Sequence, residues 1–215
     1  MRYNEFTYIY PCRPANAIKP ETLDLWDNST MAAQLKINGS NTLVFTNGES
    51  IRVMGRHNQM LTNFQISKDE IIENLYKPLN LSGNWIVLNG ETLNKSKLDE
   101  SGQTFNQKLI LFDILVFDSN YLVGRTFKER IDILDDIYGK KESDKEYLHG
   151  ISNNIYRVKS YDSGFKELFD NYTKINLIEG LVLKRKNSKL EVATGEKNNW
   201  RSQLKCRKPE KNYRY

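Results

Sequence analysis

The 215-residue sequence lacks the features that mark membrane, secreted and zinc-binding proteins. No apolar run approaches the ~20 residues that a membrane span needs. The first residues, MRYNEFTYIYPCRP, lack the basic and apolar regions of a signal peptide. The two cysteines, Cys12 and Cys206, lie near opposite ends and fit neither a zinc spacing nor a disulfide framework. We therefore expect a protein of the reducing cytoplasm with no membrane contact.

Internal repeats and low-complexity linkers are also absent. The length, the 39% hydrophobic content and the mean hydropathy of −0.65 suit one ordinary globular core. We expect a single domain over residues 1–215, a basic tail over residues 208–215 and a monomer.

Positive charge is in excess, with a net charge of +5 and a pI of about 9.0. The cations concentrate from Lys184 to Arg214, in a stretch that includes strand-like apolar segments. This distribution favours an anionic partner, nucleic acid above all, although a simple solvated tail explains Lys208 onward equally well.

Short apolar runs broken by turn residues predict many strands. Asn38-Gly39 and Asn47-Gly48 are strong hairpin signals, because both residue types tolerate positive φ. The predicted strands cover 31–35, 42–45, 51–54, 85–88, 109–117, 156–158, 180–184, 190–193 and 203–207.

Helices are fewer in the prediction. Capping boxes at Ser67–Glu70 and Thr126–Glu129 open helices to about residues 76 and 138, and Ser163 is a candidate cap for a third. Many strands with a few inserted helices predict an α+β fold built on antiparallel sheet.

Lys36 is the first candidate for chemistry. It follows the apolar strand Ala32–Leu35 and precedes Asn38-Gly39, so it would project from a rigid strand end. A glycine there would let the backbone approach a phosphate closely. Taken alone, a lysine at a strand end is usually just solvated.

Five short motifs in order change this interpretation. The segment KINGSN (36–41) resembles the K-x-x-G nucleophile motif of the covalent nucleotidyltransferases, which include ATP-dependent DNA ligases, RNA ligases and mRNA capping enzymes. Further segments resemble the later motifs of that superfamily, from the ribose-binding glutamate to motif V: LNGE (88–91), LFDIL (111–115), EGLVLK (179–184) and LKCR (204–207). Such motifs are individually weak but strong as an ordered set. The resemblance implies an antiparallel-sheet nucleotidyltransferase domain, which is the ATP-grasp-like adenylation domain of ligases.

The resemblance also implies a role for each matching residue. Lys36 would carry AMP from ATP, while Lys184, Lys205 and Arg207 would neutralise the phosphates and assist the transfer. Arg207 stands where the family usually has lysine, and lysines packed on a half-buried sheet are the simpler alternative for this group. Nucleotide contacts are implied for Leu35, Ile37, Gly39, Asn41, Arg56, Glu91 and Phe112. The sequence fits a plain core aromatic at Phe112 equally well.

Two acidic residues are candidate ligands for Mg²⁺ or Mn²⁺, because hard divalent cations prefer carboxylate oxygens. Glu179 matches the carboxylate of motif IV. Asp113 lies inside an apolar run, so it must be hydrogen-bonded or near a metal. His57 follows Arg56 and is expected to be a surface or groove residue.

The branch of the superfamily is not fixed by the sequence. KINGSN looks most like the K-[IV]-H-G-T-N of RNA ligases from T-even phage and RNA editing, with Asn38 in place of histidine. The segment from Phe112 to Ile137, with its Glu129-Arg130 pair, instead resembles DNA ligases and capping enzymes. Only eight residues follow Arg207, so we expect no OB-fold domain here and a site completed, where needed, by a partner chain or domain.

The expected function is an ATP-dependent polynucleotide ligase, preferably for RNA, which seals 5′-phosphate to 3′-hydroxyl ends in the cytoplasm, or the host cytoplasm if a phage encodes it. The alternatives are a DNA ligase, a GTP-using capping guanylyltransferase and a catalytically dead nucleic-acid-binding homologue. The departures at Asn38 and Arg207 are the case for the dead homologue. A generic basic α+β domain would require the ordered motifs to be coincidence.

Overall fold

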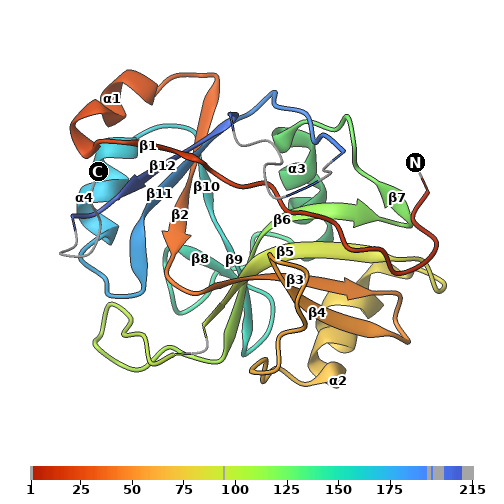
Figure 1. The fold of residues 1–215 in the computed structure, drawn as a ribbon. Coiled ribbons are helices and arrows are strands. Elements are labelled where there is room, and N and C mark those ends of the chain that lie inside the picture. The colour runs from red at the N-terminus through yellow and green to blue at the C-terminus, as the bar shows by residue number, and fades with distance from the viewer. Residues whose placement is uncertain (1, 94, 193–194, 196–200, 210–215) are drawn as a thin grey trace.

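The structure is a computed structural model that describes residues 2–93, 95–192, 195 and 201–209 (Figure 1). Two sheets carry the fold, and the longer helices lie outside them. The strands are β1 (Asn16–Ile18), β2 (Met31–Ile37), β3 (Ser40–Thr46), β4 (Ile51–Gly55), β5 (Ile86–Leu93), β6 (Lys108–Phe117), β7 (Asn120–Tyr121), β8 (Leu148–Gly150), β9 (Ile155–Val158), β10 (Ser160–Tyr161), β11 (Ile178–Arg185) and β12 (Gln203–Arg207). The helices are α1 (Leu23–Trp26), α2 (Lys68–Ile71), α3 (Phe127–Tyr138) and α4 (Phe165–Tyr172), with single turns η1 (Pro20–Thr22), η2 (Ile72–Tyr76) and η3 (Lys77–Leu79).

The five-stranded sheet has the order β1-β12-β11-β2-β10, and the seven-stranded sheet has the order β4-β3-β5-β6-β9-β8 with β7 beside β6. Neighbouring strands are antiparallel except for β1–β12 and β6–β9, which are parallel. The predicted α+β fold is confirmed, and antiparallel pairing dominates it. None of the helices in the described ranges is long and apolar enough to cross a membrane.

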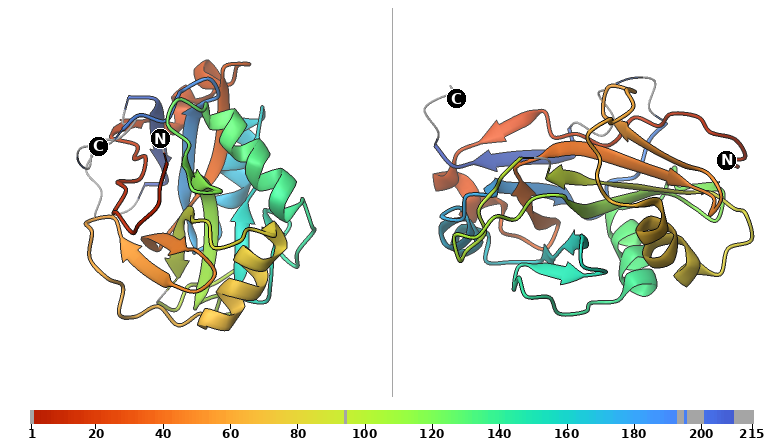
Figure 2. Two further views of the ribbon diagram at one scale, coloured as in Figure 1. Left: turned by 90° about the vertical axis from the view of Figure 1, so that its right-hand side faces the viewer. Right: turned by 90° about the horizontal axis from the view of Figure 1, so that it is seen from below.

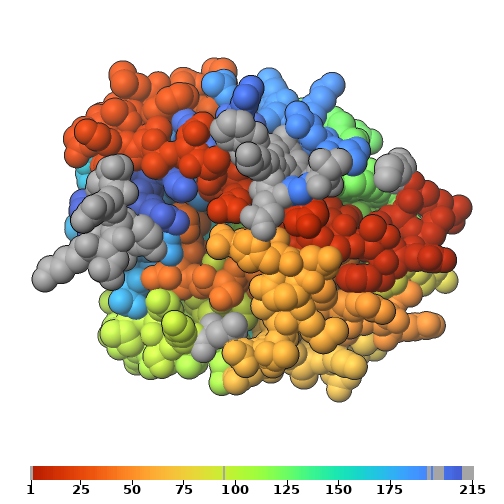
Figure 3. Space-filling model, in the orientation of Figure 1, coloured from red at the N-terminus to blue at the C-terminus, as the bar shows by residue number. Residues whose placement is uncertain are grey.

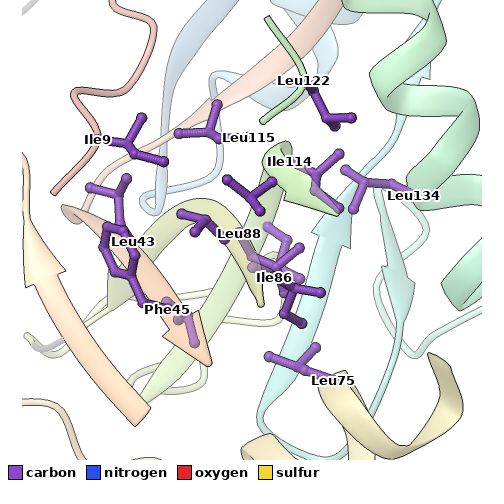
Figure 4. Packing of buried hydrophobic residues seen from close by; sticks show 14 of the residues in the cluster. Ile9, Leu43, Phe45, Leu75, Ile86, Leu88, Ile114, Leu115, Leu122 and Leu134 are labelled. Atoms are coloured by element: carbon purple, nitrogen blue, oxygen red, sulfur yellow. The ribbon is translucent and has the colours of Figure 1, made fainter. Parts of the chain in front are cut away.

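Helices cover the outer face of the seven-stranded sheet. Figure 2 shows α2 and α3 on the same side of the molecule in both views. In Figure 4, Leu75 of η2 and Leu134 of α3 reach toward Ile86 and Ile114 of the sheet, and all four side chains are almost fully buried. Because β6 is buried on both faces, its sequence is an almost continuous apolar run that only Asp113 interrupts, whereas β5 is apolar in its first three residues.

The two Asn-Gly signals have different outcomes. Asn47-Gly48 joins β3 and β4 in an antiparallel hairpin, with Gly48 at a φ of +89°. The hairpin predicted at Asn38-Gly39 is wrong, because β2 and β3 belong to different sheets. The Asn38 amide donates to the Leu177 carbonyl, and Ser40 pairs with Thr92, so the chain crosses from one sheet to the other here.

The strand predicted over 190–193 is also not formed over residues 190–192, and Ala193 lies outside the described residues. The Leu190 amide donates to the Arg125 carbonyl, and the Gly124 amide donates to the Leu190 carbonyl. These hydrogen bonds with the loop before α3 take the place of a sheet ladder.

Helix α3 begins as predicted. Thr126 Oγ1 accepts from the Glu129 amide, and Glu129 accepts from the Thr126 amide, which completes the capping box.

Helix α2 shows only half of its predicted box. Ser67 Oγ accepts from the Glu70 amide at 3.1 Å, but the Glu70 carboxylate bonds Ser152 and Asn154 instead of closing the box. Residues 72–76 continue as a π-helical turn, so the element is regular only to Ile71.

Helix α4 is not capped by Ser163. It begins at Phe165, and Asp27 from the other end of the chain accepts from the amides of Gly164 and Phe165 at 2.8 and 3.1 Å. A sequence pattern read within a short window cannot reveal such a remote cap.

The basic tail predicted over 208–215 is described only to Pro209. Lys208 is held in place: its amide donates to the Glu179 carbonyl, and its ammonium donates to the carbonyls of Thr173 and Ile175. Lys208 is therefore part of the folded body rather than a solvated tail.

Candidate active site

A cavity of about 490 Å³ lies where the two sheets face each other. Strands β2, β11 and β12 supply one wall, β3, β5 and β6 supply another, and residues 11–14 and 56–61 add to the lining. Figure 3 shows this side of the molecule, where atoms of the N-terminal segment (red) lie beside those of the segment after β4 (light orange). The volume lies in the range of small-molecule and cofactor sites.

The cavity brings together every predicted site residue except Asp113. The lining includes Leu35, Lys36, Ile37, Gly39, Asn41, Arg56, Glu91, Phe112, Glu179, Lys184, Lys205 and Arg207. The side chains of Leu35 and Ile37 are buried in the core, so their backbone faces the cavity.

Lys36 lies one residue before the end of β2, as its strand-end position predicted. Its ammonium is 2.5 Å from Glu179 Oε2, and its side chain is 19% exposed. A nearly buried lysine with its amine in a cavity can reach a bound ligand from a rigid strand.

Glu179 is the centre of the charged cluster. Besides Lys36, the guanidinium Nε of Arg207 lies 3.4 Å from Oε2. With its amide nitrogen turned toward the carboxylate, Asn38 donates to Oε1 over 3.1 Å. The two oxygens thus face different partners, which fixes the orientation of the carboxylate.

Gly180 explains why Glu179 has this position. The β2–β11 register shifts between Ile178 and Gly180, and Gly180 has a φ of +152°. A Cβ on Gly180 would lie 1.9 Å from the Cys206 carbonyl oxygen, so β12 approaches β11 too closely for any side chain there.

Lys205 extends the positive side of the cavity. Burial lowers the pKa of its ammonium, and the nearby charges of Arg207, Arg13 and Lys36 lower it further. The like charges are therefore close enough to affect one another, and an anion in the cavity would relieve their repulsion.

Lys184 occupies an apolar part of the same cavity and is 3% exposed. Its ammonium lies 5.0 Å from the Phe112 ring centre and 4.7 Å from that of Phe127. Burial lowers the pKa of Lys184 to about 8. Phe112, which is half-buried, thus has a cation over its ring as well as a place in the cavity lining.

Glu91, on β5, lines the same cavity as Lys184. Burial raises the pKa of its carboxyl to about 7, while Lys36 opposes that shift. A Cβ on Gly39 would lie 2.8 Å from Glu91 Cγ. The glycine therefore leaves room for Glu91 and β5, a different reason from the phosphate approach that the sequence suggested.

Two amide side chains present buried carbonyl oxygens that lack a hydrogen-bond partner among the described residues. Asn41 donates to Asn89 Oδ1 at 3.1 Å, and Gln34, which is 2% exposed, donates to Ser160 Oγ at 3.0 Å. Both residues line the cavity. Since buried polar atoms are rarely left unpaired, these oxygens are ready acceptors for a ligand.

Arg56 and His57 lie on a third side, where Arg56 Nε donates to His57 Nε2 at 3.0 Å. His57 and Gln59 join Arg56 in the lining, and the His57 amide donates to Gln59 Oε1. His57 is thus the groove residue that the sequence predicted.

Asp113 requires a correction. Its carboxylate receives Arg130 Nε at 2.8 Å and Arg130 Nη2 at 3.0 Å, and both side chains are almost fully buried. The Ile114 amide also donates to it. With both oxygens engaged away from the cavity, Asp113 joins α3 to β6 rather than binding a metal.

Glu129 and Arg130, adjacent in the sequence, have separate roles. Arg130 is a buried structural residue, whereas Glu129 bonds Thr126 and Arg125 at the start of α3.

The carboxylates that line the cavity are Glu91 and Glu179. No group of three metal-binding side chains occurs among the residues that the structure describes. Mg²⁺ is usually held by one or two carboxylates plus substrate phosphates and water. Glu179, with Glu91 near it, fits that pattern for a metal that arrives with a nucleotide.

Several lining residues were not singled out from the sequence, in particular Pro11, Cys12, Arg13, Pro14 and Gln34. The N-terminal segment lies far from Lys36 in sequence and carries no periodic signal. Gln34 could have been found, because it lies two residues before Lys36 and shares its strand face.

The comparisons with known proteins agree with this geometry. A family described as ATP dependent DNA ligase domain matches residues 92–202, about half of the chain. Curated protein sequences gave no match.

Solved ligase structures share the fold. A mycobacterial DNA ligase D complexed with ATP and MES is 18% identical with a TM-score of 0.60, over 93% of this chain and 58% of that one. The ligase domain of LigD from M. tuberculosis is 18% identical with a TM-score of 0.55, over 81% and 54%. A Lig E DNA ligase, from a study of DNA binding with a minimal scaffold, is 12% identical with a TM-score of 0.52, over 95% and 70%.

The chain thus spans little more than half the length of the first two structures. The family match covers Glu179, Lys184 and the strand β11 that holds them, and the fold is that of the nucleotidyltransferase part of ligases. The chain belongs to the ATP-dependent DNA ligase domain family, within the covalent nucleotidyltransferases.

Proposed function

We propose that this chain acts as an ATP-dependent polynucleotide ligase in which Lys36 carries AMP between ATP and a nucleic-acid end. One observation carries the proposal: the Lys36 amine lies in a nucleotide-sized cavity beside Glu179, with Lys205 and Arg207 on the same side. A nucleophile, a carboxylate and cations are the groups that attack on a phosphoanhydride requires.

In the first step the neutral amine of Lys36 attacks the α-phosphorus of ATP. A nitrogen–phosphorus bond forms, the bond from phosphorus to the bridging oxygen breaks, and pyrophosphate leaves with that electron pair. The attacking nitrogen loses a proton to water as lysyl-AMP forms. Lys205 and Arg207 favour this step because they offset the negative charge on the phosphates.

The nitrogen of Lys36 lies 2.5 Å from Glu179 Oε2, so the carboxylate holds the attacking side chain in place. When bound, Mg²⁺ would supply charge neutralisation at the phosphates, and Glu179 with Glu91 would hold it.

The rest of the cavity suits a nucleoside. The ring of Phe112 can stack on a base, and Glu91 can accept hydrogen bonds from ribose hydroxyls. The buried carbonyl oxygens of Gln34 and Asn41 can accept from amino or hydroxyl groups.

The later steps follow from lysyl-AMP. A 5′-phosphate of the nucleic acid takes over the AMP and releases the Lys36 amine. A 3′-hydroxyl then attacks that 5′-phosphate, and AMP leaves as the phosphodiester forms. The excess of cations would hold the nucleic-acid backbone, so binding should weaken with salt.

Two observations favour different nucleic acids. The segment Lys36–Asn41 resembles RNA ligases, whereas the matching family is described for DNA ligases. We propose a nicked duplex as the substrate, and RNA and DNA nicks are the two arms of its test. We further propose that the protein is a monomer of the cytoplasm. Where the site needs further groups, a partner chain or domain would supply them.

Adduct formation tests the proposal. The protein is incubated with Mg²⁺ and ATP or GTP labelled on the α-phosphate, and label is sought on the denatured chain. We expect label from ATP, its loss in Lys36→Ala, and its retention in Lys128→Ala, a matched lysine exposed on α3.

Label from GTP alone would indicate a capping guanylyltransferase instead. No label from either nucleotide, in a folded protein free of bound AMP, would favour a catalytically dead homologue. Once label is found, sealing of RNA and DNA nicks by the labelled enzyme distinguishes the two substrates.

A further inference from the structure

The N-terminal segment contributes a cation to the cavity. Pro11, Cys12, Arg13 and Pro14 all line it, although they lie more than twenty residues before Lys36. The segment leads into β1, which runs parallel to β12 with Ala17 opposite Lys205. In Figure 1 this part of the chain crosses in front of the sheets before it reaches β1.

The local sequence fixes where Arg13 lies. Pro11 and Cys12 are buried and anchor the segment, whereas Arg13 is exposed. Pro14 restricts its own φ, and it also holds Arg13 to an extended backbone, because a residue before proline disfavours the helical region. Arg13, which is exposed and part of the lining, therefore lies at the mouth of the cavity on a stiff, anchored segment.

The charge of Arg13 acts inside the site. It is among the causes that lower the pKa of Lys205, after burial and Arg207. Among the residues that the structure describes, cations from the N-terminal segment, β2 and β12 outnumber the carboxylates of the lining, Glu91 and Glu179. Such an excess is unfavourable in the empty protein and favourable once a polyanion binds.

Arginine is chemically suited to that ligand. Its planar guanidinium can donate two parallel hydrogen bonds to a phosphate group, and it remains charged at any physiological pH. An exposed position at the mouth suits a phosphate that lies outside the nucleoside pocket.

We propose that Arg13 is a phosphate-binding residue of this site, supplied by the N-terminal segment. Two ligands bring phosphate groups to the mouth in the proposed function, on which this inference rests: ATP with its β- and γ-phosphates in the first step, and the nucleic acid with its 5′-phosphate afterwards. The shared chemistry is bidentate donation to a phosphate group, and experiment separates the two sources.

The first arm measures equilibrium binding of ATP and AMP by calorimetry in a Lys36→Ala background, where no adduct forms. If Arg13 contacts the β- and γ-phosphates, Arg13→Ala weakens ATP binding roughly 10- to 100-fold and leaves AMP binding unchanged, as expected for a hydrogen bond to a charged group. Arg13→Lys recovers part of the loss.

The second arm uses the Arg13→Ala enzyme with an intact Lys36 and a nick whose 5′-phosphate already carries AMP. If Arg13 contacts the nucleic-acid phosphate, the KM for sealing this nick rises at low salt, while ATP and AMP binding are unchanged. Arg2→Ala is the matched control for both arms, because Arg2 lies exposed in the same segment and outside the cavity lining.

Weaker ATP binding in the first arm, or a higher KM in the second, supports the proposal if Arg13→Lys recovers part of the effect. The arm that changes identifies the phosphate that Arg13 binds. It is overturned if neither arm changes, or if every activity falls together with the unfolding midpoint and lysine gives no recovery. A wild-type protein that forms no lysyl-AMP would refute the proposed function instead, and the comparison of ATP with AMP binding would still report on Arg13.

Discussion

Lys184 places a titratable cation in the lining of the cavity, where its charge can attract a nucleotide phosphate. Burial lowers its pKa to about 8, so the side chain loses its charge near pH 8 instead of near 10.5. We predict that AMP binding weakens as the pH rises through about 8, because the neutral amine no longer attracts the nucleotide. Lys184→Met should bind AMP more weakly at pH 7 and show no such decline, as measured by calorimetry from pH 6.5 to 9.5. An unchanged decline in the variant would contradict this assignment.

The same shift has a definite sign for stability. Folded Lys184 binds its proton more weakly than the unfolded residue does, so this group makes the free energy of unfolding rise between about pH 8 and 10.5. Urea denaturation of Lys184→Met should lack that contribution.

Asp113 and Arg130 give a contrasting prediction at the residue scale. Removing one partner of a buried ion pair leaves the other charge uncompensated, so Asp113→Asn should lower the free energy of unfolding by about 3–5 kcal/mol in urea denaturation. Arg125→Ala, which breaks an exposed pair with Glu129, should change the free energy of unfolding far less, because water already screens that pair. If Asp113 bound a metal instead, Asp113→Asn would retain its stability and lose Mg²⁺-dependent adduct formation.

At the scale of elements, the closeness of β11 and β12 at Gly180 decides where Glu179 lies. Gly180→Ala would put a methyl group 1.9 Å from the Cys206 carbonyl oxygen, so the strands must separate. We expect a loss of about 1–3 kcal/mol in the free energy of unfolding. Lysyl-AMP should also form more slowly, because Glu179 moves relative to Lys36.

Gly102→Ala is the control for Gly180→Ala. Gly102 also has positive φ, at +77°, but a Cβ there meets open space. The loss in the free energy of unfolding of Gly102→Ala, measured by urea denaturation, therefore reports the cost of backbone strain alone. Equal effects of the two variants on adduct formation would show that the approach of β12 is unimportant for the site.

At the scale of the whole molecule, the cavity is built by both sheets, so a ligand that fills it should stabilise the fold. AMP at one hundred times its Kd should raise the free energy of unfolding by about 2.7 kcal/mol. Urea denaturation with AMP and with GMP measures the effect, and an equal rise with GMP would contradict a site selective for adenine. No rise with AMP would place the nucleotide elsewhere.

Much of the site was predictable because its chemistry is encoded locally. Lys36, Glu91, Glu179 and Lys205 sit in short strands with clear apolar patterns, and their motifs keep a fixed order along the chain. Their convergence on one cavity follows from which strands pair, and the motif order predicted it through family resemblance.

The errors came from interactions between distant segments. Asp113 of β6 pairs with Arg130 of α3, and Asp27 caps α4. Asn38-Gly39 connects the two sheets, and the Asn38 amide donates to the Leu177 carbonyl there. Arg13 was missed because contacts with distant parts of the chain, among them the pairing of β1 with β12, bring its segment to the site. Local propensity contains no information about such contacts.

The parallel pairing of β1 with β12 has a consequence for the newly synthesised protein. β1 leaves the ribosome early, but its partner contains Gln203–Arg207 and emerges nearly two hundred residues later. Until then the edges of β1 and β11 lack the strand between them, and exposed edges invite pairing with other chains. The strand that carries Lys205 and Arg207 is therefore added after the rest of its wall, and the nascent chain has the complete cavity only after β12 has emerged.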